Sequence, residues 1–168
     1  MNQLKKELNL IEELIRFPEG FDLMQSISIL ERNAVRNGFA PVGSHGQKKE
    51  CIRFYGKVSF GFEPSDVTLV ERNKDDLTAF KLESPLMVLA GTGGALPEPI
   101  TELVLYRNSI KDFAASDFLD IFHHKFLTLF YLARKKRYIG LNWESPNESL
   151  VSKASNLIGS LGRNNAKY

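Results

Sequence analysis

The stretch DFLDIFHHKF, residues 117–126, decides how the second half of the chain folds. It places two aspartates and two adjacent histidines within eight positions, among apolar residues. Carboxylates and imidazoles at this density are common in metal sites and in acid–base catalysis. They are also common on the polar side of a structural helix. The stretch therefore indicates either a catalytic or metal centre or a helix with one polar face.

On a helical wheel of about 100° per residue, residues 117–133 separate into an apolar and a polar face. The apolar face, which we expect to be buried, holds Phe118, Leu119, Phe122, Phe126, Leu129, Phe130 and Ala133. The polar face holds Asp117, Asp120, His123, His124, Thr128 and Tyr131, with Leu127 as an exception. The pattern predicts a long amphipathic helix. Asp120 and His124 are four residues apart, so we expect them to pair along its surface.

A metal site would need Asp117, Asp120 and His124 to converge on one ion. The chain has no H-E-x-x-H motif, and a single cysteine, Cys51, excludes cysteine-rich zinc sites and an intrachain disulfide. His45 lies in a polar loop and would have to be recruited from there. We therefore favour a structural helix without metal or cofactor, and keep polar contact with another protein as an alternative use of its polar face.

The glycine-rich loop GTGGALP, residues 91–97, is a second candidate site. A phosphate-binding loop needs Lys and Ser or Thr directly after its last glycine, and this chain has Ala followed by Leu96 there. A dinucleotide-binding loop needs a third glycine that is missing. We therefore interpret Gly91, Gly93 and Gly94 as permitting positive φ in a tight turn, and Pro97 as the start of a helix.

The order of elements predicts an α+β protein in four sections. These are N-terminal helices in residues 1–38, strands and loops in 39–96, a helical section with the long helix in 97–140, and a loose C-terminal segment in 141–168, with a last amphipathic piece at 148–161. The first section shows apolar stripes at helical spacing in residues 3–16 and 22–36, with Asp22 as the N-cap of the second helix. Short aromatic and β-branched runs in the second section predict two to four strands.

Composition and charge narrow the classes of function. The chain has 168 residues, is 43% hydrophobic and 25% charged, and carries a net charge of +2. This balance gives no case for binding nucleic acid, and the basic cluster at residues 134–137 suits the last turn of a helix. Neither a signal-peptide core nor an apolar run of about 20 residues is present, so we expect a cytoplasmic protein without membrane insertion. Twelve phenylalanines indicate an aromatic core or an apolar surface kept for a partner.

Four stretches together resemble a known family. They are FDLMQSISILER (21–32), IRFYGKVSFGFEPSDV (52–67), GTGGALPEPITELVLYR (91–107) and KDFAASDFLDIFHHKFLTLFY (111–131). In this order they resemble consecutive signatures of the TssG (ImpH) family of type VI secretion baseplate proteins. The positions that match the last two signatures most closely are Gly91, Gly94, Leu96, Pro97, Asp117, Phe118, Leu119, Asp120, Phe122 and His124.

The resemblance implies an elongated structural subunit of the baseplate wedge, and not an enzyme. It implies association with TssF, a link to the adaptor TssK, and assembly in a hetero-oligomer at the cytoplasmic face of the inner membrane. Chains of this family usually continue past the position of Tyr168, so we expect this chain to be truncated relative to them. Two alternatives stay open. One is a small metal- or phosphate-dependent enzyme that uses the Asp/His helix and the glycine-rich loop, and the other is a nucleic-acid adaptor that uses residues 134–137.

Overall fold

The computed structural model describes residues 2–44, 49–73 and 78–138. His45 and the segment 141–168, including the amphipathic piece at 148–161, lie outside these ranges. Contacts divide the chain into two compact units, Met1–Ala133 and Arg134–Tyr168, and the elements up to residue 133 form the first. The division into four sections remains a prediction.

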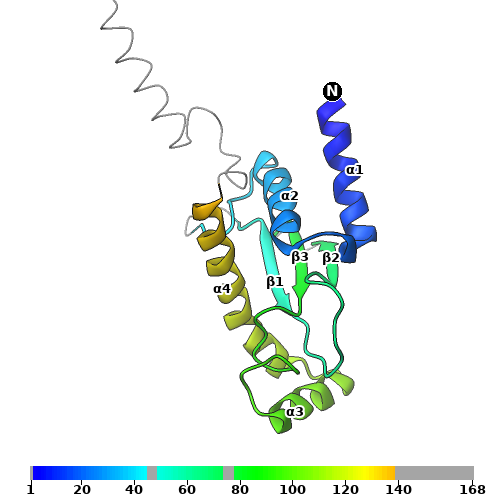
Figure 1. Cartoon of the computed structure of the whole chain (residues 1–168), viewed down its shortest axis with the longest axis vertical. Coiled ribbons are helices and arrows are strands. Elements are labelled where there is room, and N and C mark those ends of the chain that lie inside the picture. Colours follow the sequence, from blue (N-terminus) through cyan, green and yellow to red (C-terminus); the bar gives the residue numbers. More distant parts are fainter. Residues whose placement is uncertain (1, 45–48, 74–77, 139–168) are drawn as a thin grey trace, which may run out of the picture. The chain divides into compact units, whose positions relative to one another are not determined.

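The elements follow the α+β order that the sequence predicts (Figure 1). They are α1 (Asn2–Arg16), a 3₁₀ turn (Pro18–Gly20), α2 (Leu23–Arg36), β1 (Ile52–Gly56), β2 (Leu69–Arg72), β3 (Phe80–Ser84), α3 (Glu98–Ser109) and α4 (Ala114–Arg137). None of the helices in the described part of the chain is long and apolar enough to cross a membrane.

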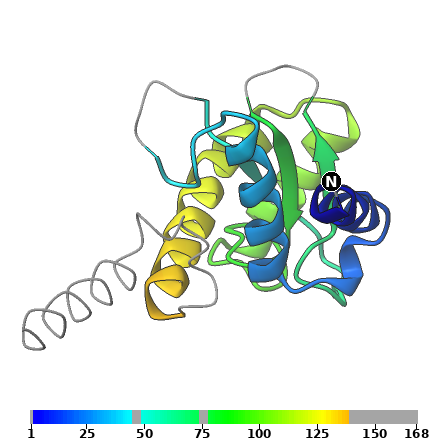
Figure 2. The same cartoon turned by 90° about the horizontal axis from the view of Figure 1, so that it is seen from above.

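The two N-terminal helices lie where the periodicity places them. Helix α1 ends as Pro18 begins the 3₁₀ turn, and α2 begins after Asp22. The Asp22 carboxylate accepts the Met24 N–H at 2.7 Å, which confirms the predicted N-cap. Seen from above, α2 lies between α1 and α4 (Figure 2). The two helices supply much of the core, through Ile11 and Leu14 of α1 and Leu23, Ile27, Leu30 and Ala34 of α2.

The three strands form one small mixed sheet in the order β1-β3-β2. Strand β1 runs parallel to β3, and β2 runs antiparallel to it. Ile52 and Phe54 of β1 lie opposite Phe80 and Leu82 of β3, and all four side chains are buried. Helix α2 contacts β1, and α1 contacts β2. The alternation of buried and more exposed side chains along β1 and β3 is that of a sheet covered on one face.

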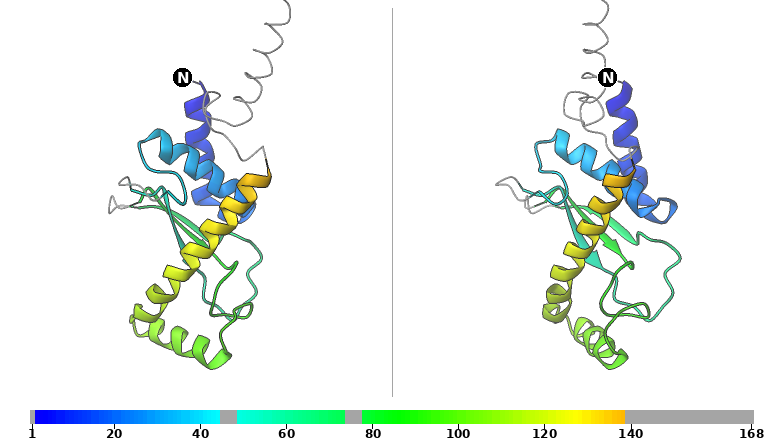
Figure 3. Two further views of the ribbon diagram at one scale, coloured as in Figure 1. Left: turned by 90° about the vertical axis from the view of Figure 1, so that its left-hand side faces the viewer. Right: turned by 60° about the vertical axis from the view of Figure 1, so that its left-hand side comes forward.

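Helix α4 follows α3 after a tight turn at Lys111, which has φ of +62°. Asp112 accepts the Ala114 N–H at 3.2 Å and binds Arg107 at 3.2 Å, and α4 begins at Ala114, three residues before Asp117. From there α4 runs alongside β1 (Figure 3). This position at the edge of the sheet determines which of its faces is buried.

The prediction for the buried face of α4 is wrong. Its buried side chains are Asp120, His123, Leu127, Thr128 and Tyr131. The phenylalanines expected in the core are exposed, with Phe118 at 59% and Phe122 at 42%. Leu119 is half-buried and Ala133 is exposed. The physical reason is that α4 meets the backbone edge of a strand, which requires hydrogen-bonding groups, and not the apolar face of the sheet.

Candidate functional site

The Asp/His stretch binds the outer edge of β1. Asp120 Oδ1 accepts the Gly56 N–H at 2.8 Å, and His124 Nδ1 accepts the Phe54 N–H at 3.2 Å. Residues two apart in a strand point their N–H groups to the same edge, about 6.6 Å apart. Residues four apart in a helix are separated by about 6 Å along its axis. The two spacings match, so one turn of α4 satisfies two donors of β1.

The predicted surface pair between Asp120 and His124 is therefore wrong. Each side chain turns toward β1, and His124 has a different acidic partner, Glu50, whose Oε2 lies 3.1 Å from His124 Nε2. Because Nδ1 accepts from Phe54, the ring proton lies on Nε2 and is donated to Glu50. Burial alone would raise the pKa of Glu50, but the hydrogen bonds from His124 and the Gly43 amide outweigh it and hold that pKa below its usual value.

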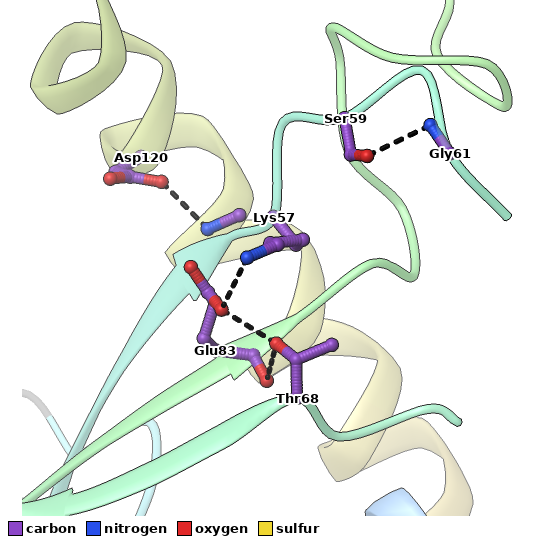
Figure 4. A network of polar contacts seen from close by, with 7 residues as sticks. Lys57, Ser59, Gly61, Thr68, Glu83 and Asp120 are labelled. Atoms are coloured by element: carbon purple, nitrogen blue, oxygen red, sulfur yellow. Dashed lines mark hydrogen bonds and ion pairs between the residues drawn. The ribbon is translucent and has the colours of Figure 1, made fainter. Parts of the chain in front are cut away.

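Asp120 is almost completely buried, with 9% of its surface exposed. Burial raises its pKa above the ordinary value, the Gly56 hydrogen bond opposes this change, and the negative charge of Asp117 adds to it. Figure 4 shows the Asp120 carboxylate turned toward the end of β1. Nearby, Glu83 of β3 lies 3.7 Å from Lys57 Nζ and accepts a hydrogen bond from the Thr68 hydroxyl at 2.7 Å. Asp120 thus holds the strand end in place, and it also lines a recess of about 550 Å³ together with Asp117 and Lys57.

His123 is buried in apolar surroundings. The residue is 2% exposed, and within the described part of the chain neither ring nitrogen has a hydrogen-bond partner of good geometry. Burial lowers its pKa to about 4 against a weaker, opposite effect of the nearby Met87 and Tyr55 backbone, so the ring is neutral at pH 7. The cavity beside it measures about 10 Å³ and is lined mostly by apolar residues, including Val58 and Val88. This space is too small for a substrate, so His123 is not placed to act as a catalytic base.

A second buried polar contact ties α4 to α2. The Tyr131 hydroxyl donates to Glu31 Oε2 at 2.7 Å, and the Val42 N–H donates to Glu31 Oε1 at 3.0 Å. Burial and the nearby carboxylate raise the pKa of Tyr131. Burial also raises the pKa of the Cys51 thiol, helped by Glu31 and Glu50, so this cysteine stays protonated and unreactive.

The glycine-rich loop uses its amides within the chain. Gly91 donates to Thr101 Oγ1 at 3.1 Å, Thr92 to the Ser59 carbonyl at 3.3 Å and Gly94 to the Gly91 carbonyl at 3.0 Å. Gly91 has φ of +132°, as the turn interpretation predicts. For Gly93 and Gly94 that interpretation is wrong, because φ is positive at neither residue.

Close packing explains why a glycine stands at position 94. A Cβ at Gly94 would collide with the Leu89 carbonyl, which accepts the Leu96 N–H at 2.9 Å. Pro97 is the residue immediately before the first turn of α3, close to its predicted place. The loop is thus a compact turn into α3, and the amides named above are not available to bind a phosphate.

The candidate residues do not converge on one centre. Asp117 is exposed, whereas Asp120 and His124 bind different strand residues. Among the described residues, no group of three or more His, Cys, Asp or Glu side chains could hold a metal ion. Sequence reasoning missed Glu50 and Gly56, the partners of His124 and Asp120. A glycine inside a strand was the available signal, because it marks a close approach of another element.

The outward side of α4 carries a continuous row of large apolar residues, which we call the phenylalanine face. It consists of Phe118, Ile121, Phe122, Phe126, Leu129 and Phe130, each at least 36% exposed. The rings of Phe118 and Phe122 pack edge to face, with centroids 5.3 Å apart. Helix α3 and the residue that follows it add a second exposed apolar row, which consists of Ile100, Leu103, Tyr106 and Ile110. Apolar surface gathered in this way is typical of a protein–protein interface.

Comparison with known proteins finds a family that covers most of the chain. The family model described as "Type VI secretion, TssG" matches residues 17–167, which include all four signature stretches. No curated protein and no solved structure matches the chain significantly.

Proposed function

The chain belongs to the TssG family of type VI secretion, and on that premise we propose that it is a structural subunit of the baseplate wedge. In this proposal the subunit associates with TssF and helps to join the wedge to the adaptor TssK, at the cytoplasmic face of the inner membrane. It acts by binding other subunits and not by catalysis.

The observation that carries the proposal is that α4 buries its polar side and exposes its apolar side. The polar side chains that resembled a catalytic centre bind the edge of β1, and the phenylalanine face is left to solvent. An exposed row of large apolar side chains is unfavourable in water, and a partner surface removes that penalty. Obligate interfaces are rich in such residues. We propose that TssF covers the phenylalanine face.

The alternative of a metal- or phosphate-dependent enzyme finds no support in the described residues. The Asp/His helix holds β1, and the glycine-rich loop donates its amides to neighbouring residues. The basic cluster at residues 134–137 forms the last turn of α4, where positive charge complements the helix dipole. No observation in the described part of the chain favours nucleic acid over this structural role.

The proposal is tested by co-expression of the chain with TssF and size-exclusion chromatography. We expect the wild type to elute with TssF, and the double variant Phe118→Gln/Leu129→Gln to bind TssF at least about tenfold more weakly. Both side chains are more than half exposed, and Gln is a good helix former, so the helix itself should be retained.

A matched control separates the phenylalanine face from apolar surface in general. Leu69 on β2 is 43% exposed, against 53% for Leu129 of the phenylalanine face. Leu69→Thr should leave binding to TssF within about twofold, because a β-branched residue suits the strand. Equal binding of TssF by the double variant and by the wild type would show that another surface makes the contact.

A further inference from the structure

We infer a second protein-docking point, in the loop of residues 57–66, where Phe62 is an anchor for an apolar socket with a basic rim on a partner protein. The inference rests on the proposed function, because a subunit that joins two others needs two separate surfaces. The partner at this loop is a different protein from the one that covers the phenylalanine face.

Phe62 is the most exposed of the large apolar side chains described, at 94%. Phe60, two residues before it, is 43% exposed. A single exposed apolar residue is ordinary on a protein surface. An aromatic ring presented almost entirely to solvent from a fixed loop is different, because aromatic anchors that enter a pocket dominate binding energy at interfaces.

Hydrogen bonds fix the loop on both sides of Phe62. On one side, Ser59 Oγ accepts the Gly61 N–H at 2.9 Å (Figure 4), and the Ser59 carbonyl accepts the Thr92 N–H at 3.3 Å. On the other side, Ser65 Oγ donates to the Glu19 carbonyl at 3.4 Å. A loop that is already ordered loses less conformational entropy on binding. The structure therefore presents Phe62 as a preorganised contact.

A recess of about 320 Å³ lies between this loop and the loop of residues 85–93, and Phe62 is part of its lining. Pro64, Leu86 and Val88 give the lining its apolar part. The partner's socket would thus close over Phe62 while its own side chains fill the recess beside it.

The opposing loop carries a residue of unusual conformation. Met87 has φ of +58° and is 50% exposed. Positive φ is uncommon for a residue with a side chain, and such strain is often found at binding sites. Methionine is also a residue that adapts its shape to a partner surface. An exposed aromatic residue and an exposed methionine thus lie on the two loops that border the recess.

The charged residues around the recess predict the charge of the partner's socket at its rim. Of the charged residues in the recess lining, Glu63 and Asp66 are acidic and Lys57 is basic. Lys57 lies 3.7 Å from Glu83, which offsets its charge. Glu19, which the loop contacts through its backbone, adds another acid nearby. Complementary potentials favour the correct partner, so a socket for Phe62 should be apolar at its base and carry Lys or Arg at its rim.

The test measures affinity for purified TssF and for purified TssK, each against the wild type, Phe62→Ser and Phe118→Gln/Leu129→Gln. We expect Phe62→Ser to weaken binding to TssK at least tenfold and to leave binding to TssF within twofold, because TssF is the protein that we propose for the phenylalanine face. The α4 double variant should show the reverse pattern. Phe62→Leu, which keeps an apolar anchor, should recover most of the lost affinity, and binding at the loop should weaken as salt is raised.

The outcomes that overturn the inference differ from one another. If the wild type binds both proteins and Phe62→Ser changes neither affinity, the loop is not a docking point and the proposed function stands. If Phe62→Ser and the α4 double variant weaken the same protein alone, the two regions form one interface and the inference fails. If the wild type binds neither protein, the proposed function fails as well. Because Phe62 is exposed, its variants should melt at the wild-type temperature, which excludes misfolding as the cause.

Discussion

Two residues of α4 have a structural role, although their chemistry first indicates a catalytic one. Asp120 and His124 have the side chains of a catalytic pair, yet each accepts one N–H of β1. An unpaired N–H at a buried strand edge is costly, so a helix that packs against such an edge needs hydrogen-bond acceptors on the side that faces the strand. The spacing of four residues, which also fits an ion pair along the helix, is what allows one turn to reach Phe54 and Gly56.

His123 gives a prediction for the pH dependence of stability. The folded state holds its pKa near 4, below the ordinary 6.5, so the unfolded state takes up a proton that the folded state does not. The contribution of His123 to stability is therefore complete above pH 6.5 and is lost as the pH falls toward 4. At pH 5 the loss should be about 2 kcal/mol.

The variant His123→Leu should remove that loss, because leucine does not titrate and fits the apolar surroundings. Urea unfolding between pH 4 and 7 measures it. We expect the wild type and the variant to differ little at pH 7, and the variant to be more stable at pH 5. Parallel stability curves across this range would mean that His123 is solvated in the folded state.

At the scale of the element, helical periodicity predicted which residues share a face but not which face is buried. The same reasoning succeeded for α2, whose apolar stripe of Leu23, Ile27 and Leu30 is buried, because this helix packs on the apolar side of the sheet. It failed for α4, which meets a backbone edge. The pattern of one helix contains no information about the strand beside it. The partners Glu50 and Gly56, which lie about 70 residues away, could not be predicted for the same reason.

Alanine substitutions in α4 test which of its two faces is buried. Leu127 is fully buried and Phe122 is 42% exposed. Leu127→Ala should lower the free energy of unfolding by about 2–5 kcal/mol, the usual cost of a buried cavity. Phe122→Ala should cost about 1 kcal/mol or less, although phenylalanine is the larger side chain. Both are measured by urea denaturation, and a larger loss for Phe122→Ala would place the phenylalanine face back in the core.

At the scale of the whole molecule, the order of motifs along the chain predicts more than the periodicity of any single element does. The order of the four signatures indicates the TssG family, and the family model matches most of the chain. The α+β class also follows from the order of elements. The position of the apolar surface could not be predicted in the same way. It depends on how α4 is set against β1, and that arrangement depends on side-chain contacts between distant segments.

The exposed phenylalanine face leads to a last prediction, about the isolated chain. Among the described residues of the first unit, no helix or strand covers the phenylalanine face. Its large apolar side chains are therefore exposed to water. Burial of apolar surface drives association whether the available surface is the correct partner or a second copy. We therefore expect the chain expressed alone to self-associate, with an apparent mass in light scattering that rises with protein concentration. Co-expressed TssF should relieve this by occupying the same face.

The double variant Phe118→Gln/Leu129→Gln should shift the isolated chain toward a monomer, whereas Leu69→Thr, at an exposed apolar position on β2, should not. The comparison isolates the phenylalanine face as the cause, because both variants remove exposed apolar surface. It also distinguishes assembly from misfolding, since the double variant should keep the helical circular dichroism of the wild type. A wild-type chain that stays monodisperse and monomeric at every concentration would mean that the face is tolerated in water, and the main argument for an obligate assembly subunit would be lost.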